Sequence, residues 1–101
     1  MKKILLCCAA GMSTSLLVKK MKAEAEKRGI EVEIWAEPLD KAKEEFAKAD
    51  VVLLGPQVKY ALPEAKKIAE ENNINIDVIN MVDYGMMNGA KVLDQALNLI
   101  K

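Results

Sequence analysis

Short apolar runs alternate with longer amphipathic stretches along the chain. Residues Lys3–Cys7 are continuously apolar after the lysine and lead into a loop of small residues, which is typical of a parallel strand buried on both faces. Residues Glu31–Ala36 alternate with a period of two, and Val51–Leu54 and Ile74–Ile79 also have the pattern of strands. The pattern therefore predicts four strands, with the first at the centre of the sheet.

Four helices are predicted after these strands, because apolar residues recur there at helical spacing and charged residues occupy the opposite face. They are expected over Ser13–Arg28, Leu39–Ala47, Leu62–Glu71 and Gly89–Lys101. Gly29 is placed as a helix C-terminal glycine, Pro38 suits a first-turn position, and Pro63 is tolerable only near a helix start. Residues 57–61 are expected to form a loop or a single turn, and residues 80–88 a loop.

Strands and helices that alternate with short connections predict an α/β protein of the flavodoxin-like type. We expect three layers, with a four-stranded parallel sheet of order 2-1-3-4 and helices on both faces. At 101 residues the chain is long enough for one such core and too short for two, so residues 1–101 are expected to form a single domain. Ligands of such folds bind beyond the carboxyl ends of the strands, where the loops 8–13, 55–61 and 80–88 should gather.

Composition narrows the possible functions by exclusion. Lys plus Arg and Asp plus Glu each number 15 without a long single-sign block, so neither nucleic acid nor anionic lipid is an expected partner. The apolar runs are far shorter than a membrane span and no signal peptide is recognised, which favours a cytoplasmic chain without direct membrane insertion. Histidine is absent, which removes the commonest general base and metal ligand, so no metal and no cofactor are expected.

The first loop carries the candidate chemistry. Cys7 and Cys8 are adjacent and have no further cysteine to pair with, so both are expected to be thiols. The small residues after Cys8 let successive N–H groups turn inward as an anion-binding nest at a helix N-terminus, which should favour the thiolate form of Cys8. The same groups would hold the oxygens of a phosphoryl group on sulfur. The predicted phosphate-binding loop consists of Ala9, Ala10, Gly11, Met12, Ser13, Thr14 and Ser15, the last three contributing hydroxyls.

Position 14 distinguishes this loop from that of cysteine phosphatases. Those enzymes follow the pattern Cys-x5-Arg, in which the arginine stabilises the transition state by a bidentate contact. Here the corresponding residue is Thr14. Without the arginine charge, attack of water on a thiophosphate should be slow, so the loop suits a phosphoryl carrier better than a hydrolase.

Three motifs together resemble a known family. Residues Cys8–Val18 look like the phosphorylation loop of enzyme IIB subunits of the lactose/cellobiose phosphotransferase family, and Val51–Val58 and Asp83–Gly85 are similar to its other loop signatures. The resemblance covers essentially the whole chain and implies a fold similar to low-molecular-weight tyrosine phosphatases. It implies a phosphocysteine at Cys8, a phosphohistidine donor on enzyme IIA, and a sugar acceptor bound by the membrane permease, enzyme IIC. The permease would then recruit the chain to the inner face of the membrane.

Several residues have a structural interpretation beside a functional one. Cys7 is expected to be a small apolar filler at the end of a buried strand. Gln57 and Tyr60 could cover the rim of the core or contact a partner, and the family resemblance favours the contact. Asp83 could be a general acid, as in phosphatases of similar fold, or could organise its own turn, and Tyr84 beside it is equally open.

The methionine cluster and the function itself also leave alternatives. Met81, Met86 and Met87 are expected to pack in the core or the loop, although flexible methionines also suit a surface that meets several partners. A low-molecular-weight phosphatase with Asp83 as acid, or a regulatory module that signals sugar status, are alternatives to transport. The sugar remains open among β-linked disaccharides such as lactose, cellobiose and chitobiose.

Overall fold

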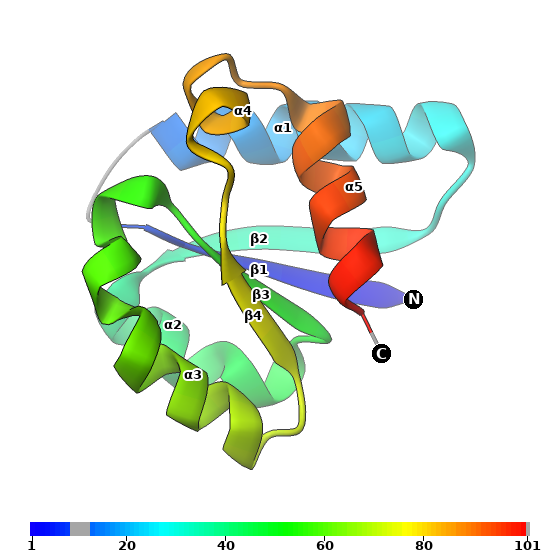
Figure 1. Ribbon diagram of the computed structural model, residues 1–101. Coiled ribbons are helices and arrows are strands. Elements are labelled where there is room, and N and C mark those ends of the chain that lie inside the picture. Colours follow the sequence, from blue (N-terminus) through cyan, green and yellow to red (C-terminus); the bar gives the residue numbers. More distant parts are fainter. Residues whose placement is uncertain (9–12, 101) are drawn as a thin grey trace.

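A four-stranded parallel sheet lies between two layers of helices in the computed structural model, which describes residues 1–8 and 13–100 (Figure 1). The strands are β1 (Lys2–Cys8), β2 (Val32–Pro38), β3 (Val51–Leu54) and β4 (Asn75–Val78). All neighbouring pairs are parallel and the order is β2-β1-β3-β4, so the predicted fold class and strand order are confirmed. β1 is an internal strand, as predicted, and β4 is an edge.

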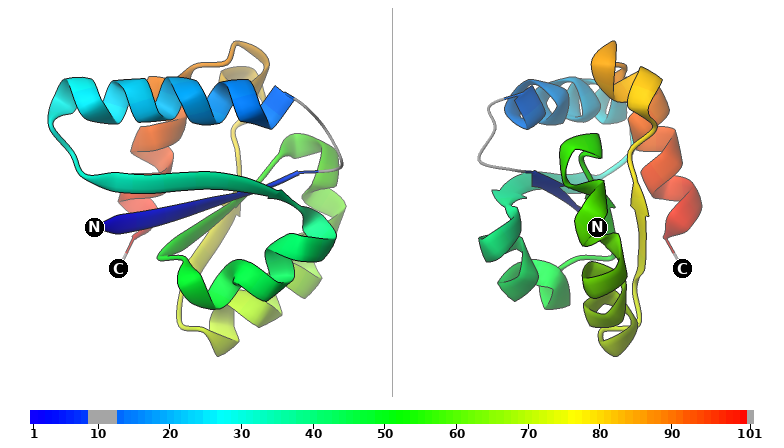
Figure 2. Two further views of the ribbon diagram at one scale, coloured as in Figure 1. Left: turned by 180° about the vertical axis from the view of Figure 1, so that it is seen from behind. Right: turned by 60° about the vertical axis from the view of Figure 1, so that its left-hand side comes forward.

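The helical segments are α1 (Ser13–Arg28), α2 (Leu39–Glu45), the 3₁₀ turn η1 (Phe46–Lys48), the 3₁₀ segment η2 (Pro56–Ala61), α3 (Leu62–Glu71), α4 (Met81–Gly85) and α5 (Gly89–Leu99). Helices α1 and α5 cover one face of the sheet, and α2 and α3 cover the other (Figure 2). Within residues 1–8 and 13–100, no helix combines the length and the apolar character that crossing a bilayer requires.

Two apolar cores, one on each face of the sheet, bury the side chains of the central strands. Alternate side chains of a strand point to opposite faces, so Ile4 and Leu6 of β1 pack towards α1 and α5, while Leu5 and Cys7 pack towards α2 and α3. β3 divides its four buried residues between the cores in the same way. Phe46 in η1 is fully buried in the second core. A continuously apolar strand is thus explained by burial on both of its faces.

The boundaries differ from the predicted ones where packing or capping decides them. Residues 80–88 were predicted to be a loop, but α4 forms there, because the Asn80 side chain accepts hydrogen bonds from the backbone N–H groups of Val82 and Asp83. Pro38 is the last residue of β2 and the N-cap of α2 and does not lie within its first turn. The second predicted helix tightens into η1 after Glu45, which places Phe46 in the core.

Two residues mark helix ends as predicted. Gly29 adopts a φ of +71° just after α1, the left-handed conformation that glycine allows at a helix end. Pro63 lies in the first turn of α3, where its missing N–H would have no helical partner. Residues 57–61 belong with Pro56 to the 3₁₀ segment η2, which is kinked at Val58 (φ −118°, ψ 21°), consistent with the expected turn.

Candidate functional site

The carboxyl ends of β1, β3 and β4 are tied to one another by backbone hydrogen bonds. The N–H of Gly55 donates to the carbonyl of Cys7 at 2.8 Å, and the N–H of Ile79 donates to the carbonyl of Leu54 at 2.8 Å. Each strand exit is therefore held by the strand beside it. The segments that follow β3 and β4, namely η2 and α4, start from the same edge of the sheet as Cys8.

Cys8 is the last residue of β1 and is almost buried, at 4% exposure. Its thiol donates to the backbone carbonyl of Glu37 on β2, with Sγ 3.7 Å from the oxygen. A thiolate or a phosphocysteine has no proton to donate, so this contact belongs to the unmodified thiol. Sequence patterns could not have revealed Glu37, because its contribution is a backbone carbonyl whose direction depends on β-sheet register.

Most of the predicted phosphate-binding loop, namely Ala9, Ala10, Gly11, Met12 and the side chain of Ser13, lies outside the described residues. Of the remaining two hydroxyls, Thr14 is buried at 1% exposure while Ser15 is exposed on the first turn of α1. The N-terminus of this 16-residue helix follows the Cys8 strand directly after the loop. Their contact with phosphate remains a prediction.

Cys7 occupies the opposite face of β1 and has no exposed surface. Burial, reinforced by the neighbouring Cys8, raises the pKa of its thiol from 9.0 to about 12. A thiol in this environment keeps its proton near neutral pH, so it is a poor nucleophile. The interpretation of Cys7 as an apolar filler is confirmed.

The alkaline limit of stability should therefore depend on Cys7. The folded chain retains the Cys7 proton while the unfolded chain releases it, so this stabilisation is complete below pH 9.0 and is lost as the pH rises through about 12. We expect the urea midpoint of the wild-type chain to fall more steeply across this range than that of Cys7→Ala. Parallel slopes for the two proteins would contradict this account.

Gln57 and Tyr84, two of the predicted loop residues, meet although 27 positions separate them in sequence. The Gln57 Nε2 donates to the Tyr84 hydroxyl at 2.9 Å, which joins η2 to α4. The Gln57 amide also lies over Gly55, since a Cβ at Gly55 would come within 2.7 Å of Gln57 Oε1. A side chain at position 55 would push this amide away, so glycine there permits the contact.

Removing the Tyr84 hydroxyl should release the Gln57 amide without unfolding the chain. For Tyr84→Phe we expect a loss of less than about 1 kcal/mol, because the bond is solvent-accessible. The Gln57 side-chain amide signals in an NMR spectrum should shift towards solvent-exposed positions. Tyr60→Phe is the matched control, since Tyr60 is 75% exposed, and it should leave those signals in place. Unchanged Gln57 signals in Tyr84→Phe would contradict the hydrogen bond between Gln57 and Tyr84.

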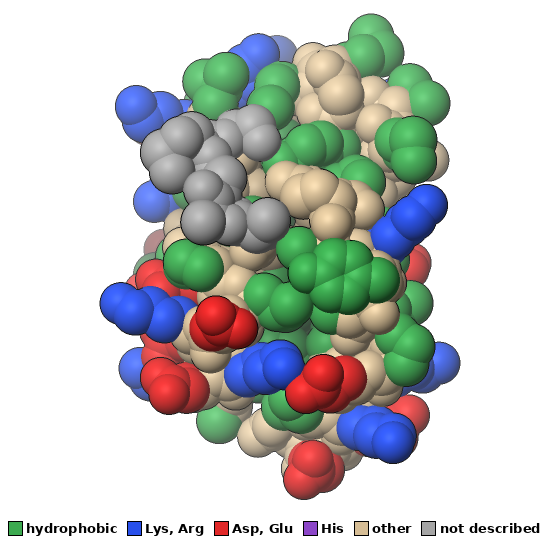
Figure 3. Space-filling view, turned by 90° about the vertical axis from the view of Figure 1, so that its left-hand side faces the viewer, with side chains coloured by type: hydrophobic (Ala, Val, Ile, Leu, Met, Phe, Trp, Pro, Cys, Tyr) green, Lys and Arg blue, Asp and Glu red, His purple; other side chains and the backbone are tan. Residues whose placement is uncertain are grey.

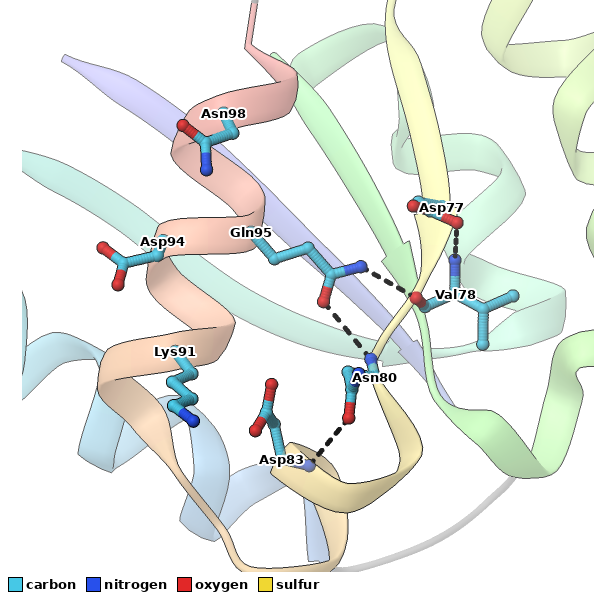
Figure 4. Close-up of a pocket in the computed structure, with 8 residues that line it drawn as sticks. All are labelled: Asp77, Val78, Asn80, Asp83, Lys91, Asp94, Gln95 and Asn98. Atoms are coloured by element: carbon cyan, nitrogen blue, oxygen red, sulfur yellow. Dashed lines mark hydrogen bonds between the residues drawn. The ribbon is translucent and has the colours of Figure 1, made fainter.

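Asp83 lies beyond the outer edge of β4, in a polar groove between β4 and α5 (Figure 4). The groove is lined by Asp77, Val78, Asn80, Asp83, Lys91, Asp94, Gln95 and Asn98. Its lining does not include Cys8, which lies two strands away from β4 in the sheet. The turn that begins α4 is organised by Asn80, a residue that the sequence interpretation did not select. The signal in the sequence was the asparagine itself, because asparagine is a preferred N-cap residue and Asn80 comes directly before the five residues of α4.

Exposed apolar side chains lie on the segments that follow β3 and β4, at the carboxyl ends of the strands. Tyr60, Met81, Val82 and Met86 are all largely exposed, whereas Met87 is half-buried and packs against the core under α1. Hydrophobic side chains occupy much of the face in Figure 3, while charged ones are concentrated in its lower part. Among the described residues, no group of three or more Cys, Asp or Glu side chains is arranged to hold a metal ion.

Known proteins that this chain resembles are IIB components of one system. The family described as "PTS system, Lactose/Cellobiose specific IIB subunit" matches residues 3–95. The chain is 55% identical to the oligo-beta-mannoside-specific EIIB component of the PTS system of Bacillus subtilis (strain 168), with 99% of this chain and 97% of the relative covered. It is 49% identical to the galactose-specific EIIB component of Lactococcus lactis subsp. cremoris (strain MG1363), with 98% and 96% covered. The cellobiose-specific component of L. lactis subsp. lactis (strain IL1403) gives the same identity and coverage.

Solved structures agree with this assignment. The cellobiose-specific phosphotransferase IIB component of Borrelia burgdorferi superimposes with a TM-score of 0.81 at 40% identity, covering 98% of this chain and 91% of that one. The lactose-specific IIB domain of the phosphoenolpyruvate:carbohydrate phosphotransferase system of Streptococcus pneumoniae gives a TM-score of 0.89 over 99% and 98% of the two chains, at 22% identity, which shows a shared fold. The chain therefore belongs to the lactose/cellobiose-specific IIB subunits of this system, and it is a phosphotransferase of sugar uptake.

Proposed function

We propose that Cys8 accepts a phosphoryl group from a phosphohistidine of enzyme IIA and passes it to a sugar held by the enzyme IIC permease. In this proposal residues 1–101 act as a single phosphocarrier domain. The contrast between the two cysteines carries the proposal. Cys8 ends β1 at the edge of the sheet where ligands of parallel α/β folds bind, while Cys7 is sealed in the core and retains its proton.

Two in-line displacements at phosphorus make up the transfer. In the first, the Cys8 thiolate attacks, a P–S bond forms, and the P–N bond breaks with its electron pair returning to the donor imidazole. In the second, a sugar hydroxyl oxygen attacks, a P–O bond forms, the P–S bond breaks, and the thiolate is regenerated while the hydroxyl proton leaves to water or a base. The Cys8 proton must depart before the first step, which ends the contact with the Glu37 carbonyl.

The backbone N–H groups of Ala9, Ala10, Gly11, Met12, Ser13, Thr14 and Ser15 form the phosphate cradle in this proposal. The long helix α1 starts at Ser13, so its positive N-terminal end adds to the field that stabilises the bound anion. The residue six positions after Cys8 is the buried Thr14, which brings no charge to the cradle. Hydrolysis of the thiophosphate is then unassisted, and this favours a carrier over a hydrolase.

The sugar belongs to the β-linked disaccharide class in this proposal, with cellobiose, chitobiose and lactose as members. Relatives named for oligo-β-mannosides, galactose and cellobiose share 55%, 49% and 49% of their residues with the chain. Such similar carriers with different named sugars support a division of labour, in which the permease selects the sugar and Cys8 meets one hydroxyl. The same proteins support enzyme IIA and enzyme IIC as partners at the cytoplasmic side of the membrane.

Enzyme IIA and the permease use one overlapping face in turn, because both must reach the same thiol. The exposed side chains of Tyr60, Met81 and Met86 beside the strand ends support such a face. Competition binding tests it: saturating enzyme IIA should displace the chain from permease-containing membranes. A stable ternary complex of enzyme IIA, this chain and the permease would contradict a shared face.

The decisive experiment supplies the general phosphoryl donors of the system and enzyme IIA, then maps the label. Histidine is absent from the chain, so a retained label cannot be a phosphohistidine on it. We expect the label on the Cys8 peptide, stable without permease and lost only when permease and sugar are added together. A label on serine, threonine or aspartate, or rapid release of inorganic phosphate in the absence of sugar, would refute the carrier role.

A further inference from the structure

Gln95, a side chain of α5, bonds to the backbone at the carboxyl end of the outer edge of β4. The N–H of Ile79 faces β3, so the backbone groups of Val78 and Asn80 on either side of it face outward. Gln95 Nε2 donates to the Val78 carbonyl at 2.8 Å, and its Oε1 accepts from the Asn80 N–H at 3.3 Å (Figure 4). One side-chain amide thus bonds both groups, as the N–H and C=O of one residue in a further parallel strand would, and it holds the chain where β4 ends.

The residue held in this way organises α4. The Asn80 side-chain oxygen accepts from the N–H groups of Val82 at 2.9 Å and Asp83 at 3.1 Å, and the Asn80 carbonyl accepts from the N–H of Tyr84 at 2.9 Å. α4 has only five residues and none of them is fully buried. A helix of this length has little stability of its own, so its position depends on how its cap is held.

α4 then reaches the segment beside Cys8. Tyr84 holds the Gln57 amide at 2.9 Å, and that amide lies over Gly55. The Gly55 N–H donates to the carbonyl of Cys7, one residue before Cys8. A continuous set of contacts therefore runs from α5, through Asn80 and Tyr84, to the strand exit that carries the proposed phosphoryl acceptor.

We propose that Gln95 is a positioning residue for phosphoryl transfer: it fixes α4 at the end of β4, so that Tyr84 holds Gln57 against the strand exit next to Cys8. This inference rests on the proposed function, because it assumes that Cys8 receives the phosphoryl group. Gln95 lies on the far side of the edge strand from Cys8 and acts only through α4. Its importance therefore comes from geometry and not from contact with phosphate.

The test compares Gln95→Met with Asn98→Ala in single-turnover transfer from phosphorylated enzyme IIA to the full chain. Methionine matches glutamine in length and volume but cannot bond Val78 or Asn80, whereas Asn98 lines the same groove on the same helix. We expect Gln95→Met to lower the rate at saturating enzyme IIA by roughly tenfold, because small misplacements of reacting groups are costly. The half-saturating concentration should change by less than about twofold, because Gln95 lies away from the face proposed to bind enzyme IIA. Asn98→Ala should match the wild type, because Gln95 and not Asn98 bonds the backbone groups of Val78 and Asn80.

A double-mutant cycle separates positioning from mere stabilisation. If Gln95 acts through the Tyr84–Gln57 contact, Gln95→Met should add little to the loss in Tyr84→Phe, whereas independent structural damage would add fully. Gln95→Glu replaces the donor to Val78 by a second acceptor, and it supports the same comparison should Gln95→Met not fold. Additive losses, or wild-type transfer by folded Gln95 variants, would overturn the inference.

The two proposals fail in distinguishable ways. Equal labelling of the wild type and Cys8→Ser would remove the proposed function itself. Labelling confined to Cys8, together with a wild-type rate in Gln95→Met, would remove only the positioning role.

Discussion

Cys8→Ser is expected to abolish acceptance of the phosphoryl group from enzyme IIA while leaving the fold intact. A serine hydroxyl stays protonated near neutral pH and is a far weaker nucleophile than a thiolate, so the transfer rate should fall by about 10³-fold or more. The fold should survive, because the substitution is close to isosteric and the hydrogen bond from the thiol to the Glu37 carbonyl is long, with Sγ 3.7 Å from the oxygen. Time-resolved labelling with phosphorylated enzyme IIA measures the rate, and urea unfolding measures the stability.

Cys7→Ala is the matched control for this experiment. It removes the adjacent thiol, which is fully buried and has a pKa of about 12, so labelling should stay near the wild-type level in the folded variant. Cys8→Ser keeps the Cys7 thiol, so the two variants together show whether a thiol anywhere in this segment is sufficient. Labelling of Cys8→Ser at the wild-type rate, or its loss in a folded Cys7→Ala protein, would assign the chemistry to a different residue.

Gly89→Ala should destabilise the protein by about 2–3 kcal/mol, although it adds only one methyl group. Gly89 begins α5 against the backbone of α1, and a Cβ there would come within 2.7 Å of the Lys20 carbonyl carbon and 2.8 Å of the Met21 nitrogen. Backbone atoms cannot rotate away as a side chain can, so one helix must shift. For a chain of this size the loss corresponds to a fall in Tm of roughly 10 °C.

Gly85→Ala provides the control, because a Cβ at Gly85 would have no heavy atom within 4 Å. The same substitution in open space should leave Tm within about 2 °C of the wild type, since surface changes are usually within about 0.5 kcal/mol. Thermal unfolding of the two variants side by side makes the comparison. Equal Tm values for Gly85→Ala and Gly89→Ala would show that α5 can retreat from α1 without loss.

Long and strongly patterned elements were predictable from sequence, and short capped ones were not. α1 matches its predicted range because sixteen residues contain several helical periods and Gly29 ends it in a left-handed conformation. α4 was predicted to be a loop because five residues contain little more than one turn, and its existence depends on the Asn80 cap. The pairing of Gln57 with Tyr84 has no local signal, because it joins two segments that meet only in the folded chain.

By itself, the sequence determined the order of the strands and the long helices, and through that alternation the fold type with its strand order. The physical reason is that the patterns of apolar residues that indicate a buried strand, an amphipathic helix or a half-buried strand can be recognised from consecutive residues. Only the tertiary structure decided which groups meet at the carboxyl ends of the strands. These are the Glu37 carbonyl beside Cys8, the hydrogen bond between Gln57 and Tyr84, and the hydrogen bond of Gln95 to the end of β4. These contacts depend on register and on helix docking, which are properties of distant segments brought together and not of any local pattern.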